Sequence, residues 1–198
     1  MRNRMTRRVK DSQDGFEQAV AAFESVYNDQ DFNFKPYSDF YIQKDTNEYG
    51  DVNFDFCAPS TSYFLTTGYS TGSDKVDRDL EITYEAWFDE FLKEYQKNYP
   101  NEDVYDHDNK YNEEADEEVL RYIDEHIGIY YDVDLKSFYN SEYKGGIQII
   151  FEINSSSYTR GDNKNETIMD EVFDVTDLEG IKAFAQQIID YIGGIHFD

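Results

Sequence analysis

Carboxylates are the most concentrated chemically active side chains in this sequence, and many of them stand four residues apart. Glu113 and Glu117 have this spacing, and so do Glu114 and Glu118, which places each pair on one face of a helix. Such like-charged pairs destabilise a helix by roughly 0.2–0.5 kcal/mol each. They are separated by about 6 Å along the helix axis, a distance comparable with the spacing of phosphates along a nucleic-acid strand. The pattern favours a surface that binds cationic groups over one selected for helix stability.

The acidic residues are densest between residues 74 and 125, a segment that contains 19 carboxylates and six cations. Glu81, Glu85 and Asp89 continue the four-residue spacing there. Over the whole chain, 43 acidic residues oppose 18 basic ones, and the formal net charge is −25. Such a field attracts basic surfaces and repels nucleic acid and anionic membranes. Two explanations are open: the acids are solvated faces of amphipathic helices, or they form a binding stripe for a basic partner.

A possible nucleophile is found in Gly68-Tyr69-Ser70-Thr71-Gly72, which matches the pattern of a nucleophile elbow. That motif needs a buried strand before it and a packed helix directly after it. Residues 73–79 are mostly charged and offer only Val76 as an apolar contact, and the chain has no oxyanion motif of the HGGG type. Clusters of Gly, Ser and Thr are typical of loops. We interpret the segment as a turn, with a hydrolase that uses Ser70 as the alternative.

Histidine and cysteine are too sparse to build a metal site. His107, His126 and His196 do not stand at ligand spacing on a helix, so surface positions are expected. Cys57 is the only cysteine, which excludes an intramolecular disulfide and a cysteine-built metal site, and its apolar neighbours predict burial. We therefore expect no catalytic residue, no metal and no cofactor, and a binding protein rather than an enzyme.

An acidic series in the same segment loosely resembles a calcium-binding loop. Its members are Asp106, Asp108, Asn112 and Glu117. Lys110 occupies a ligand position, and Tyr111 replaces the glycine that the sharp turn of such a loop requires. The series therefore does not predict a calcium site.

Hydrophobic periodicity predicts the elements that position these side chains. Helices are expected at residues 14–28, 83–99, 113–127 and 176–192. Asp14 is expected to cap the first helix, and Thr176 with Glu179 to form a capping box for the last. Strands are expected at residues 40–43, 52–56, 63–67, 129–133, 138–143, 147–153 and 167–175. The acidic segment thus coincides with two consecutive helices joined by an acidic linker, Glu102–Asp108.

The length and composition predict one folded domain. The 198 residues fit a single domain at 13–198, preceded by a flexible basic arm at 1–12 that contains five of the 18 cations. A mean hydropathy of −0.81 with high charge is typical of disorder, but an aromatic content of 17% indicates a core rich in Phe, Tyr and Ile. We expect the α+β class, with a mostly antiparallel sheet flanked by three to four amphipathic helices. The absence of a signal-peptide pattern and of long apolar runs predicts a cytoplasmic protein of a bacterial or phage-infected cell.

The composition and the 74–125 segment resemble the acidic DNA-mimic inhibitors of phages and mobile elements, which include anti-restriction and anti-CRISPR proteins. The resemblance is one of charge and aromatic content, without a motif matched residue by residue. It implies an inhibitor that occupies the basic channel of a nucleic-acid-binding enzyme, such as a host nuclease or a CRISPR or restriction effector. The alternatives are an immunity protein or antitoxin that neutralises a basic toxin, and a non-inhibitory structural or regulatory acidic domain.

The predicted partner is a basic protein surface, and direct contact with nucleic acid or membrane is not expected. Carboxylates would meet the Arg and Lys side chains of the partner, and nearby tyrosines would form the rim of the contact. The predicted binding residues are Asp89, Glu90, Glu94, Glu102, Asp103, Asp106, Asp108, Glu113, Glu114, Asp116, Glu117 and Glu118, with Tyr95, Tyr99, Tyr105 and Tyr111 at the rim.

Overall fold

A single antiparallel sheet and a set of helices make up the fold. The computed structural model describes residues 2–28, 41–58, 60–138, 145–157 and 163–195. Within them the helices are α1 (Arg2–Asn28), α2 (Ser62–Thr67), α3 (Asp74–Asn98), α4 (Lys110–His126) and α5 (Leu178–Ile195). The strands are β1 (Tyr41–Thr46), β2 (Val52–Cys57), β3 (Ile127–Phe138), β4 (Gly146–Ser157) and β5 (Asn163–Asp174), paired in the order β1-β2-β3-β4-β5. The predicted α+β class with an antiparallel sheet is confirmed.

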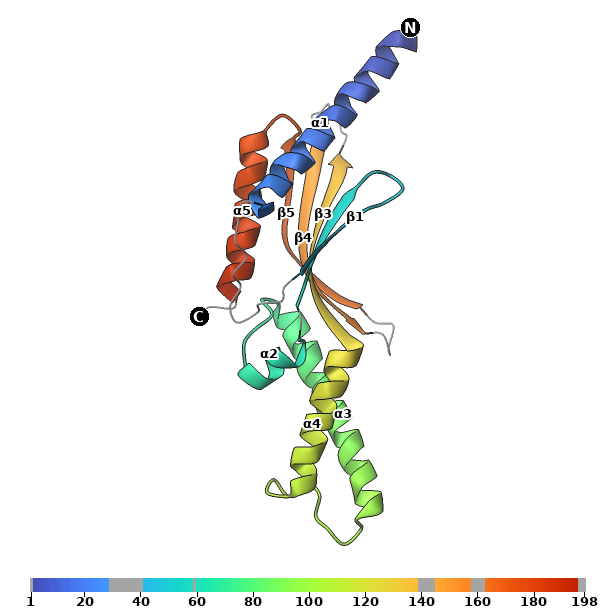
Figure 1. Cartoon of the computed structure of the whole chain (residues 1–198), viewed down its shortest axis with the longest axis vertical. Coiled ribbons are helices and arrows are strands. Elements are labelled where there is room, and N and C mark those ends of the chain that lie inside the picture. The colour runs from blue at the N-terminus through green and yellow to red at the C-terminus, as the bar shows by residue number, and fades with distance from the viewer. Residues whose placement is uncertain (1, 29–40, 59, 139–144, 158–162, 196–198) are drawn as a thin grey trace.

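Alternation of apolar and polar residues gives the sheet two different faces. In β3, Ile129, Tyr131 and Val133 are fully buried, while the residues between them are only partly buried. β4 repeats the pattern with Ile149 and Phe151. Figure 1 shows α1 and α5 on one side of the sheet, and both helices contribute buried side chains to the core that contains these strand residues. The sheet and its helices therefore form two layers, and the polar residues of the strands face away from the core.

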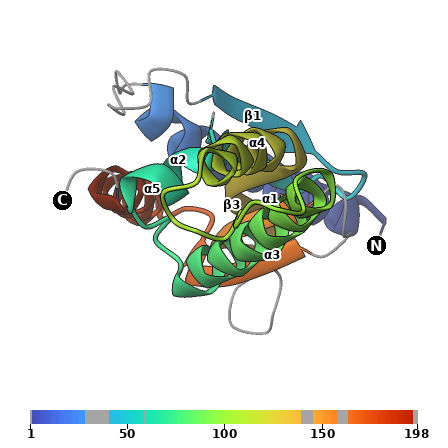
Figure 2. The ribbon, with the colours of Figure 1, turned by 90° about the horizontal axis from the view of Figure 1, so that it is seen from below.

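Helices α3 and α4 form an antiparallel hairpin that extends beyond one end of the sheet (Figure 1) and whose members lie side by side when seen from below (Figure 2). Near the sheet, Val76 of α3 and Ile123 of α4 belong to the main core. Towards the tip, a second cluster of buried residues joins Leu92, Tyr111 and Val104 of the connecting loop. The hairpin is therefore held by packing along its whole length.

The first helix is longer than the sequence analysis predicted. Helix α1 begins at Arg2 and continues through Asp14, so the expected helix start capped by Asp14 is wrong, and residues 2–12, predicted to belong to a flexible arm, are helical. Residues 2–14 contain neither Pro nor Gly and are rich in Arg, Lys and Met, which have high helix propensity. Local propensity therefore extends the helix past the end of its apolar stripe.

The predicted aromatic strand at 63–67 is instead the short helix α2. The backbone N–H and hydroxyl of Ser62 both donate to the carboxylate of Asp124 on α4, at 2.8 and 2.7 Å, and Phe64 is buried. Gly68 ends the helix in the left-handed region, with φ of 70°. A short aromatic run has no clear period, so a contact with a residue far along the chain decided its conformation.

Several other helices and strands begin or end at residues that differ from the predicted ones. Helix α3 begins at Asp74 rather than 83, because the Ser73 hydroxyl accepts from the Val76 N–H at 3.1 Å and caps it. Helix α5 is capped by Asp177, whose carboxylate accepts from the Gly180 N–H at 3.1 Å, so the capping box of Thr176 and Glu179 is wrong. β4 and β5 extend into the segment expected to be a turn at 155–165. The expected strand at 138–143 lies almost entirely outside the described residues.

Candidate partner-binding surface

Helix α4 presents an outer face that is almost entirely acidic. Its buried residues recur every four positions and pack inward: Tyr111, Ala115, Val119 and Ile123. The period of 3.6 residues therefore directs most carboxylates of the helix away from the core. Five of them form two adjacent rows, Glu113 and Glu117 in one and Glu114, Glu118 and Glu125 in the other. We call these five residues the α4 ridge; Asp124 instead accepts hydrogen bonds from Ser62 of α2.

One cation interrupts the α4 ridge. Arg121 forms an ion pair with Glu118 and a second one, at 3.8 Å, with Glu125. These exposed pairs fix one guanidinium against two carboxylates, and such pairs contribute little to stability. Glu113, Glu114 and Glu117 make no ion pair with any described residue, so no described cation is paired with the first two turns of the ridge.

Helix α3 places its acidic residues on two flanks rather than in one ridge. Asp89 continues the row of Glu81 and Glu85, and all three are exposed. Glu90 and Glu94 point to another side, where an open groove is lined by Glu90, Lys93, Glu94, Gln96, Lys97 and Tyr105. Two lysines therefore neutralise the second flank, and α3 adds less net charge than the spacing of its carboxylates predicted.

The loop between the helices carries four exposed acids at the tip of the hairpin, Glu102, Asp103, Asp106 and Asp108. The Gln96 side-chain amide donates to the backbone carbonyl of Glu102 at 2.9 Å. The Asn109 side-chain amide donates to the backbone carbonyl of Asp103 at 2.9 Å. Because Val104 between them is fully buried, the loop is anchored, and the acids of the linker lie next to the start of the α4 ridge.

The predicted tyrosine rim is only partly correct. Tyr99 and Tyr105 are 43% and 50% exposed, and Tyr95 is half-buried. Tyr111 was wrongly placed at the rim, because it is 7% exposed and belongs to the hairpin's own core. The rings of Tyr99 and Tyr111 stack with their centroids 4.3 Å apart. Tyr111 therefore supports the exposed tyrosine instead of contacting a partner.

Asp116 is also turned inward. It is half-buried between the helices and accepts a hydrogen bond from the hydroxyl of Tyr84 on α3. Burial and the bond to this carboxylate raise the pKa of Tyr84 well above its ordinary value. Asp116 therefore joins the two helices, and its carboxylate is not part of the outer face.

Removing this bond tests whether Asp116 has a structural role. We expect Tyr84→Phe to lower the free energy of unfolding by about 1 kcal/mol, because a charge-assisted hydrogen bond is lost and the ring is kept. Urea denaturation of the variant and the wild type measures the change. Tyr105→Phe is the control, since its exposed ring lies in the groove, and it should leave the midpoint unchanged. An unchanged midpoint for Tyr84→Phe would contradict the structural role.

The polar face of the sheet is a second acidic surface, which the sequence analysis missed. In the strand register Asp55 lies opposite Asp132, and Asp132 lies opposite Glu152, so three carboxylates cross β2, β3 and β4 in a row. Asn154 donates a hydrogen bond to Asp132, and Thr167 donates to Glu152 at 2.6 Å. The signal that could have found this row is the acidic residues that alternate with apolar ones in β2 and β3.

Asp132 forms a side-chain hydrogen bond with Asp55 in this row. Partial burial, a hydrogen bond with Asp55 and the nearby negative charges raise the pKa of Asp132 to about 9. Asp132 therefore keeps a proton more readily than a free carboxyl does, which lowers the charge of the row. Among the described residues, no group of His, Cys, Asp or Glu has the arrangement of a metal site. The row is a hydrogen-bonded network within the sheet.

The Ser70 segment lacks the surroundings of a nucleophile. It follows the short helix α2 rather than a strand, and the Ser70 hydroxyl donates to Asp77 at 2.6 Å. The Gly72 N–H donates to the same hydroxyl at 2.9 Å. The buried hydroxyl of Tyr131 donates to the backbone carbonyl of Thr71 at 2.9 Å, which ties the loop to the sheet. These bonds position the start of α3, as expected for a turn.

The remaining candidates take the positions expected of surface or core residues. His107 is exposed in the hairpin loop, and His126 stacks on Tyr122 with ring centroids 3.7 Å apart. His196 lies outside the described residues. Cys57 is buried, as predicted. No described helix combines the length and the apolar character required to cross a bilayer.

The fold and the ridge together define an α+β protein with a projecting acidic helical hairpin. Comparisons add no relative to this description: no family model matches the chain, and no curated protein or solved structure is significantly similar to it. The function is therefore argued from the surface itself.

Proposed function

We propose that this protein binds a basic surface of a nucleic-acid-binding enzyme and inhibits it by occupying the place of nucleic acid. The α4 ridge and the acids of the hairpin loop are the contact surface, and Tyr99 and Tyr105 contribute exposed rings at its edge. The place of action is the cytoplasm of a bacterial or phage-infected cell.

The observation that carries this proposal is the uninterrupted start of the α4 ridge. Glu113, Glu114 and Glu117 are exposed and make no ion pair with the described residues. Glu113 and Glu117 lie about 6 Å apart along the helix axis, a separation of the same order as that of phosphates along a nucleic-acid strand. The hairpin extends away from the sheet (Figure 1), so a concave basic channel can receive it without contact with the rest of the protein.

Electrostatic binding of this kind makes affinity and association rate depend on salt. We expect a partner captured from a bacterial lysate at low salt to be released at high salt. Its affinity for this protein should fall more than about tenfold between roughly 50 and 200 mM salt, as it does for proteins that contact several phosphates. Fluorescence anisotropy with the purified partner measures this fall.

Competition with nucleic acid for the same partner tests whether this protein acts as a nucleic-acid mimic. Labelled DNA or RNA bound to the partner should be displaced by this protein in proportion to occupancy, because both ligands need the same cationic side chains. Simultaneous binding of both ligands would contradict mimicry. A salt-independent affinity would contradict the whole electrostatic proposal.

A further inference from the structure

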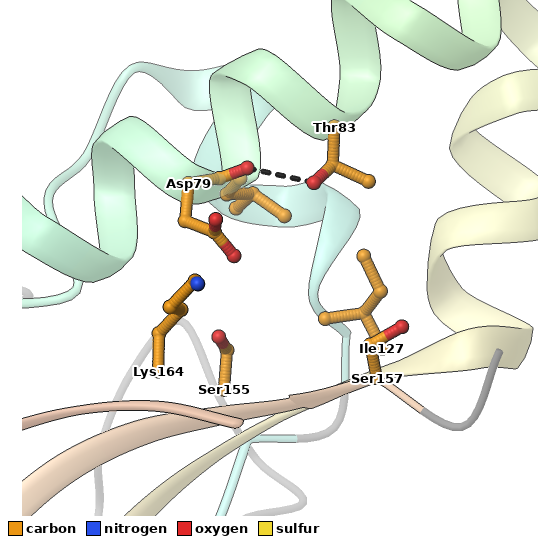
Figure 3. A pocket seen from close by; sticks show the side chains of 7 residues that line it. Asp79, Thr83, Ile127, Ser155, Ser157 and Lys164 are labelled. Atoms are coloured by element: carbon orange, nitrogen blue, oxygen red, sulfur yellow. Dashed lines mark hydrogen bonds between the residues drawn. The ribbon is translucent and has the colours of Figure 1, made fainter. Parts of the chain in front are cut away.

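A small cavity lies between the first half of α3 and the end of the sheet where β3 begins, β4 ends and β5 begins (Figure 3). Its volume is about 90 Å³. Leu80 and Ile127 form its apolar part, and both are buried. The rest of the lining consists of hydroxyl groups and two opposite charges. The cavity is separate from the α4 ridge and independent of the function proposed for it.

The cavity exists because the core face of β4 changes in composition. This face carries Ile149, Phe151 and Ile153, and then Ser155 and Ser157. Protein interiors are normally close-packed, and a large apolar residue at these two positions would continue the layer. The serines leave a space and line it with oxygen atoms.

Ser155 places a polar group in the wall of this space. The residue is 5% exposed, and its hydroxyl makes no hydrogen bond with any residue that the structure describes. Figure 3 shows its oxygen directed into the cavity. The hydroxyl keeps contact with the space of the cavity, so water or a ligand there completes its hydrogen bonds.

Two opposite charges face the cavity from different walls. Asp79 comes from α3, and Lys164 comes from β5, where it is the cross-strand neighbour of Ser155. Neither forms an ion pair within the described part of the chain. Figure 3 shows the carboxylate and the ammonium turned towards the same space. The hydroxyl of Thr83, in the same wall as Asp79, donates to the Asp79 backbone carbonyl at 2.8 Å.

We propose that this cavity binds a small zwitterion, of the class of a free α-amino acid with a side chain no larger than that of alanine. The ammonium of the ligand pairs with Asp79, and its carboxylate pairs with Lys164 and accepts from Ser155. One water needs about 10–15 Å³ on the same measure, so the cavity has room for roughly six to nine water-sized groups. This size fits glycine or alanine and excludes aromatic amino acids.

Isothermal titration calorimetry with the full chain tests the proposal, with glycine and alanine as ligands and acetate, methylammonium and phenylalanine as comparisons. We expect saturable binding of glycine that is at least about tenfold tighter than that of acetate or methylammonium, since one molecule joins both charged groups. Phenylalanine should not bind. Equal binding of acetate and glycine, or no saturable heat with glycine, would mean an anion site or a water-filled cavity and would overturn the proposal.

Substitutions in the lining test whether glycine binds in this cavity. Asp79→Asn and Lys164→Gln should each weaken glycine binding at least about tenfold, because each removes one charge pair. Lys97→Gln is the matched control, since this exposed lysine at the far end of α3 does not line the cavity, and binding should be unchanged. Ser155→Val fills the cavity, so it should abolish binding while the midpoint of thermal unfolding stays equal or rises. Glycine binding that survives Ser155→Val would contradict the proposed location.

Discussion

Replacing Glu113, Glu114 and Glu117 together by lysine is expected to abolish binding to the basic partner while the protein stays folded. These side chains are exposed, and none of them makes an ion pair with the described residues. The substitution replaces the attraction at the centre of the contact by repulsion, so we expect the dissociation constant to rise at least about a hundredfold. The loss should lie mainly in the association rate at low salt. Stopped-flow or surface plasmon resonance measurements separate the two rates.

A control with the same change in charge is available elsewhere on the molecule. Glu17 of α1, Glu171 of β5 and Asp190 of α5 are exposed and distant from the hairpin in sequence. Their joint replacement by lysine alters the net charge equally, so it should weaken binding only through the overall field, by less than about tenfold at moderate salt. Equal losses in both variants would mean that net charge, and not the α4 ridge, determines binding. Circular dichroism should show both variants folded, since Glu113 in the first turn contributes only about 0.3–1 kcal/mol through the helix dipole.

The second large effect concerns the acidic row on the sheet. We expect Asp132→Asn to raise the free energy of unfolding at pH 9 relative to the wild type, because the folded wild type must there keep a proton that the unfolded chain has already released. Protonated Asp132 hydrogen-bonds to Asp55 and accepts from Asn154. An asparagine at this position can make both bonds with its amide and never loses a proton.

The direction of the pH dependence follows from the raised pKa. Burial and Asp55 raise the pKa of Asp132 from 3.8 to about 9, so between these values the folded protein holds a proton that the unfolded chain releases. Stability contributed by this proton is complete below about pH 4 and declines as the pH rises towards 9. Wild type and Asp132→Asn should therefore be similar in stability at low pH and diverge at alkaline pH. Denaturant titrations at several pH values measure the divergence.

Asp134 provides the matched control for this experiment. It lies on the same face of β3, accepts from Asn53 at 3.0 Å and forms an ion pair with Lys136 at 2.7 Å. Asp134→Asn removes the ion pair with Lys136 and leaves the carboxyl of Asp132 in place, so stability should still decline towards alkaline pH. Parallel pH profiles for wild type and Asp132→Asn would show that the row holds no shared proton.

The two acidic surfaces consequently differ in what they offer a partner. The sheet row is linked by hydrogen bonds, and the raised pKa of Asp132 lowers its charge. The α4 ridge begins with carboxylates that lie in solvent and make no ion pair with described residues. A basic partner therefore gains more from the ridge than from the sheet, although both contain carboxylates in rows.

The spacing of apolar residues along the sequence determined most helices and strands of this protein. The periods of apolar residues in α4 and α5 and the alternation in β2, β3 and β4 predicted helices and strands at nearly the observed places, because these periods depend only on backbone geometry. The antiparallel α+β class followed from them. The same periodicity predicted that Glu113, Glu114 and Glu117 would share the outer face of one helix, since three- and four-residue spacing brings side chains together without help from the rest of the chain.

Only the tertiary structure decided which polar residues are turned inward. Asp116 bonds to Tyr84, Tyr111 packs beside Leu92, and Asp132 reaches Asp55, and each pair joins residues from different elements. Strand pairing assembled the acidic row of the sheet, and a contact with Asp124 made residues 62–67 a helix. A single sequence shows spacing along one element but not the register between elements. Burial, shared protons and the cavity at Ser155 arise from that register.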